Sequence, residues 1–182
     1  HDIHPVDLLA MTLNELVKRA GVDKSQVEDV VGGVVTPLGD QGACVPRLAA
    51  LKGGFPIEVP GVQLNRFCGS GQQAVHFAAQ GILAGSYDLA IACGVESMTR
   101  APMASNASSK PVTIGRDDDS FQVGGQGPFS ADFLAACDGQ LMTQFEVAQI
   151  LADRFAISRE DMDAYAARSH ERAHASTESG HF

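Results

Sequence analysis

Residues 61–98, GVQLNRFCGSGQQAVHFAAQGILAGSYDLAIACGVESM, decide the fold of this 182-residue chain. The first seven of them alternate like a β-strand and run into Cys68, and residues 71–84 have the small side chains of a closely packed helix. Residues 89–98 then read as a second, apolar strand. A strand, a helix and a strand with short connections form a βαβ unit, which predicts a parallel sheet covered by helices.

The residues before this unit continue the alternation of helices and strands. Apolar residues at helical spacing predict a helix over 6–20 that ends at Gly21. A β-branched run predicts a strand over 27–35, and a short helix is expected over 44–52. We therefore expect an α/β protein with a mixed, largely parallel sheet. Because the chain opens with a helix and stops without a terminating element, we also expect it to be cut at both ends and to lack the first strand of its sheet.

The composition changes after about residue 104. Residues 105–140 are rich in Ser, Gly, Asp and Asn, which predicts a long loop. Helical patterns return over 142–156 and 159–176, and the later one starts with the capping-box spacing of Ser158 and Asp161. We expect an α/β half-domain over 1–104 and the start of an inserted helical sub-domain over 105–182.

Charge and hydropathy argue against two classes of partner. The formal net charge is −9 and the Lys and Arg residues are scattered, so we expect no binding to nucleic acid. No apolar run reaches the length that spans a bilayer, so we expect no membrane insertion.

The cysteines contain no CxxC pair, and a chain with this apolar content does not need disulfides. We expect free thiols in an intracellular, cytoplasmic protein, with an organelle as the alternative.

Cys68 is the candidate nucleophile. The expected strand ends at it and Gly69-Ser70-Gly71 turns the chain into a helix, so the thiol lies at a helix N-terminus, where free N–H groups and the helix dipole favour a thiolate. Gly69 and Gly71 leave room for a substrate, and the Cys68 N–H is placed to bind an oxyanion. The arrangement parallels the nucleophile elbow of serine hydrolases. The alternative is a small buried core residue, as most free cysteines are.

Other reactive side chains have simpler explanations. His170-Glu171-Arg172-Ala173-His174 matches the HExxH zinc motif on an expected helix, but no third ligand follows at a persuasive spacing, and an exposed helix face is the alternative. We expect packing rather than chemistry from four other reactive side chains, namely Cys44, Cys93, Cys137 and His76. Arg66 either steers an anionic ligand or forms a structural ion pair.

Three stretches resemble the thiolase family: NRFCGSGQQAV at 65–75, GSYDLAIACGVESMTRAPM at 85–103 and FAISREDMDAYAARSHERA at 155–173. The resemblance implies the layered thiolase fold, with Cys68 as the nucleophile that carries an acyl group between a 3-ketoacyl-CoA and coenzyme A. It implies coenzyme A as a substrate, no permanent cofactor or metal, and a homodimer or homotetramer in which the strand before Cys68 is a candidate interface. It favours degradation of fatty acids or sterol side chains, with biosynthetic acetoacetyl-CoA formation as the alternative.

Two departures from the family pattern matter. The family also uses the histidine of a Gly-His-Pro motif and a second cysteine in a Cys-x-Gly motif, both in its C-terminal half. Gly-His-Pro is absent from these residues, and the one Cys-x-Gly match, Cys137-Asp138-Gly139, does not fall in that half. We therefore expect the 182 residues alone to be inactive. Gln144 and Phe145 stand where many members have Met-Gly-x-Thr-Ala-Glu, which resembles members that accept bulky acyl groups; ordinary helix packing by Phe145 is the alternative.

Three rival functions follow from the same residues. The first is a non-catalytic thiolase-like protein that binds acyl-CoA or acts as a scaffold. The second is the zinc hydrolase. The third is a ketoacyl synthase, whose nucleophile typically lies in a Cys-Ser-Ser context unlike Cys68-Gly69-Ser70.

Overall fold

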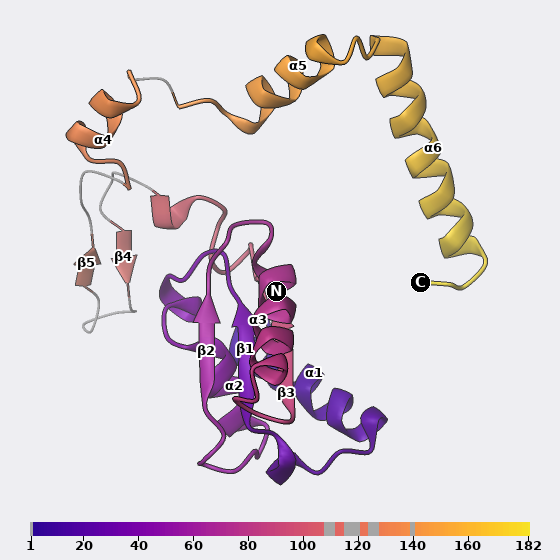
Figure 1. The fold of residues 1–182 in the computed structure, drawn as a ribbon. Helices are drawn as coiled ribbons and strands as arrows, with labels where there is room; N and C mark the ends of the chain where they lie inside the picture. Colours follow the sequence, from indigo (N-terminus) through magenta and orange to yellow (C-terminus); the bar gives the residue numbers. More distant parts are fainter. Residues whose placement is uncertain (1, 108–111, 115–120, 124–127, 139–140) are drawn as a thin grey trace. The chain divides into compact units, whose positions relative to one another are not determined.

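The computed structural model describes residues 2–107, 112–114, 121–123, 128–138 and 141–182. The chain divides into two compact units, residues 1–128 and 129–182. The elements, coloured along the chain in Figure 1, are α1 (Pro5–Ala20), η1 (Lys24–Gln26), β1 (Asp29–Gly33), η2 (Gly39–Gln41), α2 (Val45–Lys52), β2 (Gly61–Leu64), α3 (Ser70–Leu83), β3 (Ala90–Gly94), η3 (Ser105–Ala107), β4 (Val112–Ile114), β5 (Phe121–Val123), α4 (Ala131–Ala136), α5 (Gln144–Arg154) and α6 (Arg159–Glu178).

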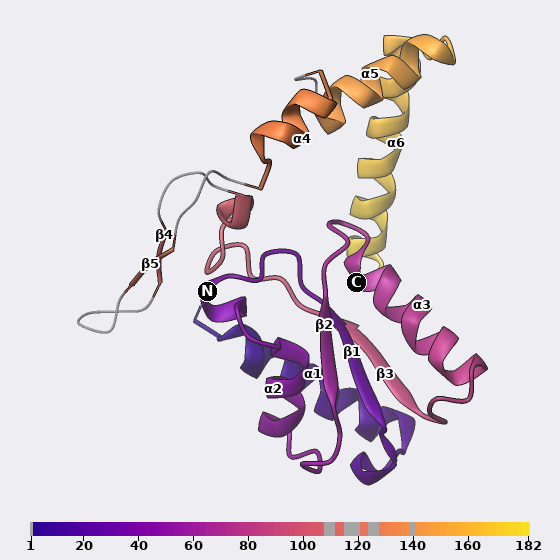
Figure 2. The same ribbon diagram turned by 60° about the vertical axis from the view of Figure 1, so that its left-hand side comes forward.

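A three-stranded parallel sheet forms the centre of the first unit, in the order β2-β1-β3. Helices α1 and α2 cover one face of this sheet and α3 covers the other, as Figures 1 and 2 both show. The expected βαβ unit is present, but its two strands are not neighbours, because β1 lies between β2 and β3. The expected α/β class is confirmed. In the described residues, antiparallel pairing is confined to β4 and β5.

The side chains of β1 alternate between the two faces and tie the layers together. Val30 of β1 and Val34, the residue after the strand end, are buried in the core cluster that α1 and α2 share with the sheet. Val31 points to the other face and packs with Ala74 and Ala78 of α3. This period of two is what a strand covered on both sides requires. Each fully buried valine contributes about 1.5–3 kcal/mol, so β1 is the element on which both helical layers depend.

Local signals at both ends explain why α1 forms where the sequence predicts. Pro5 occupies the first turn, and the His4 side chain accepts a hydrogen bond from the Val6 N–H at 3.2 Å. Gly21 ends the helix in the left-handed conformation, with φ of 65°. The buried face is formed by side chains at helical spacing, namely Leu9, Leu13 and Val17.

The three strands are shorter than the sequence predicts. They end at Gly33, Leu64 and Gly94, whereas apolar alternation predicted strands to 35, 67 and 98. Beyond each end, a side chain captures a backbone N–H: Glu96 accepts from Val35 and Thr36, Asn65 accepts from Phe67, and Gln41 accepts from Ser97. An N–H engaged in this way is not available to a strand ladder, so pairing stops there.

The second unit consists of α4, α5 and α6. The predicted helices over 142–156 and 159–176 are confirmed, and Ser158 with Asp161 forms the expected capping box. The predicted long loop over 105–140 contains η3, the β4–β5 pair and the short helix α4; its residues 108–111, 115–120, 124–127 and 139–140 lie outside the described part. The assignment of 1–104 to a half-domain and 105–182 to a loop domain stays a prediction.

Candidate active site

A tight turn joins β2 to α3 and carries Cys68. Strand β2 ends four residues before Cys68, so the expectation that the strand runs straight into the cysteine is wrong. Within the turn, the Gly69 N–H donates to the Arg66 carbonyl at 3.1 Å and the Ser70 N–H donates to the Phe67 carbonyl at 3.0 Å. Phe67 has a left-handed φ of 47°, which costs a non-glycine residue about 1–2 kcal/mol. The turn therefore holds the residue before Cys68 in an unfavourable conformation.

Side chains hold this strained turn in place. Asn65 Oδ1 accepts from the Phe67 N–H at 2.8 Å. The buried Ser70 hydroxyl accepts from the Arg66 N–H at 2.8 Å and donates to the Phe67 carbonyl at 2.6 Å. The Arg66 guanidinium donates to the Gln73 side chain on α3. Of the two roles considered for Arg66, the structural one is closer to what is observed, although its partner is an amide and not a carboxylate.

The surroundings of Cys68 leave it open to a reagent. Its side chain is exposed, and a Cβ added at Gly71 would meet nothing within 4 Å. Among the described residues, no acceptor pairs with the backbone N–H groups of Cys68, Gly71 or Gln72. Cys68 comes just before Gly69, the N-cap of the fourteen-residue helix α3. An exposed thiol beside free N–H groups at a helix start matches the needs of a nucleophile and of an oxyanion.

Backbone contact with the sheet fixes the position of this helix start. A Cβ on Gly33, the last residue of β1, would lie 2.6 Å from the Ser70 carbonyl carbon and 2.8 Å from the Gly71 nitrogen. Only glycine permits so close an approach of strand and helix. The end of β1 thus acts as the surface against which the Cys68 turn is seated. The sequence analysis assigned no role to Gly33 or Asn65, and it treated Ser70 only as a small residue of the turn.

A hollow of about 340 Å³ lies beside β2 and extends to Asn65 of the turn. Its lining combines residues of β2 with residues of the segment between η2 and α2, together with Val34 and Pro37. Cys44 is part of the lining, and its thiol donates to the Gly61 carbonyl at 3.3 Å. The lining of this hollow reaches to three residues before Cys68 in the sequence.

The other cysteines are less suited to nucleophilic attack. Burial raises the pKa of the Cys93 thiol to about 12, so this sulfur stays protonated at neutral pH. Cys44 and Cys137 are half-buried, and all four cysteines are free thiols. His76 lies two turns along α3 from Cys68, on the exposed part of the helix. Among the four cysteines, Cys68 is the exposed one. Its predicted role as nucleophile stays a prediction.

The HExxH match offers no metal site in the described residues. His170, Glu171 and His174 are exposed on α6. Among the residues that the structure describes, no group of three or more His, Cys, Asp or Glu side chains is arranged to hold a metal ion. Without a third ligand, the zinc-hydrolase alternative has no structural support.

Gln144 and Phe145 lie at the start of α5, in the second unit. Both are exposed, Phe145 by 85% of its surface. Phe145 does not pack within its own unit, so the helix-packing alternative does not account for it there. The predicted role of both residues in a substrate channel stays a prediction.

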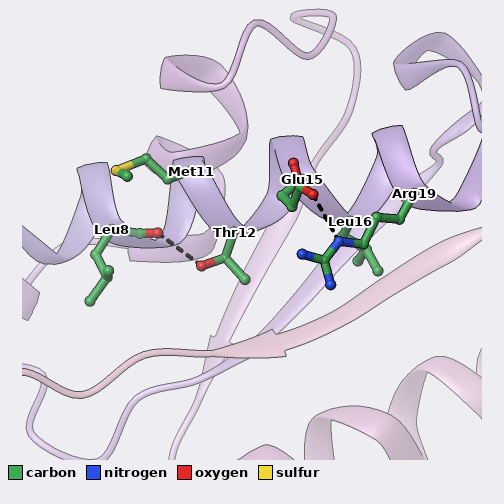
Figure 3. Close-up of a pocket in the computed structure, with 6 residues that line it drawn as sticks. All are labelled: Leu8, Met11, Thr12, Glu15, Leu16 and Arg19. Atoms are coloured by element: carbon green, nitrogen blue, oxygen red, sulfur yellow. Dashed lines mark hydrogen bonds and ion pairs between the residues drawn. The ribbon is translucent and has the colours of Figure 1, made fainter. Parts of the chain in front are cut away.

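Figure 3 shows a second hollow, on the outer face of α1. Its lining is Leu8, Met11, Thr12, Glu15, Leu16 and Arg19. The Thr12 hydroxyl donates to the Leu8 carbonyl at 3.0 Å, and Arg19 pairs with Glu15 at 2.8 Å within the same helix. With its polar groups already paired along α1, this hollow offers no group suited to acyl transfer.

The fold and this turn define an α/β protein with a candidate cysteine nucleophile at a strand-to-helix junction. The chain belongs to the thiolase family, because the whole of residues 1–182 matches the thiolase N-terminal domain. None of the helices in the described residues combines the length and apolar character needed to traverse a bilayer.

Curated relatives show the same relationship. The chain is 39% identical to the steroid 3-ketoacyl-CoA thiolase FadA6 of Mycobacterium tuberculosis, over 99% of this chain and 42% of the relative. It is 32% identical to the 3-ketoacyl-CoA thiolase of Bacillus subtilis, over 99% of this chain and 41% of the relative. It is 40% identical to the peroxisomal 3-ketoacyl-CoA thiolase 5 of Arabidopsis thaliana, over 98% of this chain and 36% of the relative. The chain therefore spans about two fifths of the length of the relatives it matches.

Proposed function

We propose that the protein carrying this chain is a 3-ketoacyl-CoA thiolase in which Cys68 is the nucleophile. The observation that carries this proposal is the exposed Cys68 thiol in a turn held by side-chain hydrogen bonds, next to free N–H groups at the start of α3. The names of the bacterial and plant relatives support the choice of reaction.

The proposed reaction has two halves. The Cys68 thiolate attacks the 3-keto carbon, the bond between C2 and C3 breaks, and its electron pair takes up a proton at C2 to release acetyl-CoA. The shortened acyl chain stays on Cys68 as a thioester. The thiolate of free coenzyme A then attacks the thioester carbonyl, releasing the shortened acyl-CoA and Cys68. In both halves the carbonyl oxygen becomes negative, and in this proposal the Cys68 N–H helps to stabilise it.

The proton transfers need groups beyond those described here. The 182 residues contain no Gly-His-Pro, and the Cys137-x-Gly139 match includes a residue outside the described part. Because the chain spans about two fifths of its relatives, we place the acid and base in the remainder of the whole protein. In this proposal coenzyme A is a substrate, no permanent cofactor takes part, and the whole protein is a homodimer or homotetramer.

The proposed substrate is a 3-ketoacyl-CoA with a bulky acyl group. Phe145 presents a large exposed aromatic surface at the start of α5, beside Gln144. A sterol side-chain substrate agrees with the printed name of the Mycobacterium relative. The alternative, biosynthetic condensation of two acetyl-CoA molecules, requires no such surface.

Mass spectrometry of the acylated protein tests the proposal. The full-length protein is mixed with a 3-ketoacyl-CoA in the absence of free coenzyme A, and its peptides are analysed. We expect an acyl group on the Cys68 peptide, lost on addition of coenzyme A, absent in Cys68→Ser and retained in the control Cys137→Ser. Binding of the acyl-CoA with no label on Cys68 would instead support the non-catalytic scaffold.

A further inference from the structure

A hydrogen-bonded path links Glu96, beyond the end of β3, to the turn that carries Cys68. One Glu96 carboxylate oxygen accepts from the Val35 N–H at 2.8 Å, and the other accepts from the Thr36 N–H at 3.1 Å. The carbonyl of the same Val35 accepts from the Asn65 side-chain amide at 2.9 Å. Asn65 Oδ1 in turn accepts from the N–H of Phe67, the residue before Cys68. The path therefore runs from one carboxylate, through one peptide group, to the nucleophile turn.

The start of this path is well anchored. Gln41 is fully buried, and its side-chain amide donates to the Thr36 carbonyl at 2.9 Å and to Glu96 at 3.2 Å. Its side-chain oxygen accepts from the Ser97 N–H at 2.7 Å. A buried polar group whose donors and acceptors are all engaged has one favoured arrangement, because any displacement leaves a buried group unpaired. Glu96 and Gln41 therefore fix the Val35 peptide as a rigid support.

Asn65 transmits this support to a residue that would otherwise relax. Phe67 is 74% exposed, and its left-handed backbone is unfavourable for a bulky residue, so packing does not hold it in place. The Ser70 hydroxyl and N–H hold the Phe67 carbonyl, and the bond from the Phe67 N–H to Asn65 ties the same residue to Val35. If the Phe67 backbone relaxes to an ordinary φ, the side chain of the next residue, Cys68, points in a different direction.

We propose that Asn65 is a positioning residue for Cys68, and that Glu96 acts through it by fixing Val35. The inference rests on the proposed function of Cys68 as the acyl carrier. It assigns to the Glu96–Gln41 cluster a role in aiming the nucleophile, in addition to joining the strand ends.

The test compares single-turnover acylation of Cys68 in full-length variants. Asn65→Ala removes both bonds, and a 1 Å misplacement of a reacting group costs about 100-fold in rate, so we expect a loss of about 10- to 100-fold in the acylation rate with an unchanged substrate dissociation constant. Asn65→Ser keeps an oxygen that can accept from the Phe67 N–H, and we expect it to recover part of the loss. A change in substrate binding without a change in acylation rate would overturn the inference.

Matched controls separate aiming from stability. Asn106→Ala removes another side-chain donor to the same Val35 carbonyl, at 3.2 Å, but leaves the Phe67 N–H bond intact. Glu28→Gln alters a carboxylate that accepts from the Asp88 N–H at the opposite end of the sheet. Both controls are expected to acylate at the wild-type rate, whereas Glu96→Gln, which keeps one acceptor oxygen of two, is expected to acylate several-fold more slowly.

The alkylation rate of Cys68 by iodoacetamide, measured against pH in the same variants, distinguishes the possible failures. If wild-type Cys68 is never acylated, the proposed function fails, and the alkylation profiles still report on positioning. If wild-type Cys68 is acylated and Asn65→Ala and Glu96→Gln match it in both acylation rate and alkylation profile, the positioning role is wrong. Should Asn65→Ala fail to fold, Asn65→Ser and Glu96→Gln decide by the same criteria.

Discussion

Alanine at Gly33 tests whether the end of β1 sets the position of Cys68. The new Cβ would lie 2.6 Å from the Ser70 carbonyl carbon, with two further contacts at 2.8 Å, and its nearest neighbours are mostly backbone atoms. Restoring a separation near 3.4 Å requires the start of α3 to retreat by about 0.8 Å. Overpacking of this kind costs about 1–3 kcal/mol of stability. Displacement of a reacting group by about this distance lowers a rate by up to about 100-fold.

The neighbouring glycine supplies the control. A Cβ on Gly32 would clash with the Pro46 ring at 2.2 Å, on the face of the sheet opposite α3. We therefore expect both Gly32→Ala and Gly33→Ala to lower the thermal unfolding temperature, but only Gly33→Ala to slow alkylation of Cys68 by iodoacetamide, by about 10- to 100-fold. The assay follows the modified Cys68 peptide with time, at a temperature where both variants are folded. A folded Gly33→Ala variant whose Cys68 reacts at the wild-type rate would refute the reasoning, as would equal slowing in both variants.

Three further predictions concern groups away from this contact. Burial raises the pKa of Cys93 from 9.0 to about 12, so its thiol stays protonated in the folded protein where the unfolded chain ionises. The free energy of unfolding, measured by urea titration at several pH values, should therefore fall as pH rises above about 9, and Cys93→Ala should weaken that dependence. Gly81→Ala should destabilise the protein by about 1–3 kcal/mol, measured by denaturant unfolding, because its Cβ would clash with the Tyr87 ring at 2.2 Å. Hydrogen bonds from the backbone and side chain of Thr143 hold the pKa of Glu146 below its usual 4.5. The capping box of α5 is therefore intact above that value and is lost as pH falls through the lowered pKa. Amide exchange at the start of α5 should rise on acidification, and Glu146→Gln should abolish that pH dependence.

The helices were predictable because their signals are local. The stop at Gly21 and the capping box of Ser158 with Asp161 each involve residues within one turn of the helix end. The same is true of the alternation in β1, whose neighbours Val30 and Val31 face opposite layers. Patterns of this kind are set by adjacent residues, so a sequence shows them directly.

The strand ends and the supports of the Cys68 turn depend on contacts between distant residues. Glu96 meets Val35 across 61 positions of the sequence, and Asn65 meets Val35 across 30. No local pattern predicts such a bond, so apolar alternation was extended too far at each strand end. Gly33 is a similar case, because its need for glycine arises from the backbone of α3 and not from its own neighbours. Cys68 was recognisable as a candidate nucleophile from the glycines that follow it and from the resemblance to the thiolase family.

The most direct test of the account is the fate of the Cys68 sulfur during reaction with a 3-ketoacyl-CoA. Rapid acid quench followed by mass spectrometry of the full-length protein should find the shortened acyl chain on Cys68 within one turnover, and free coenzyme A should remove it at a rate compatible with turnover. Turnover without any acyl group on Cys68, or undiminished turnover in Cys68→Ala, would contradict the account.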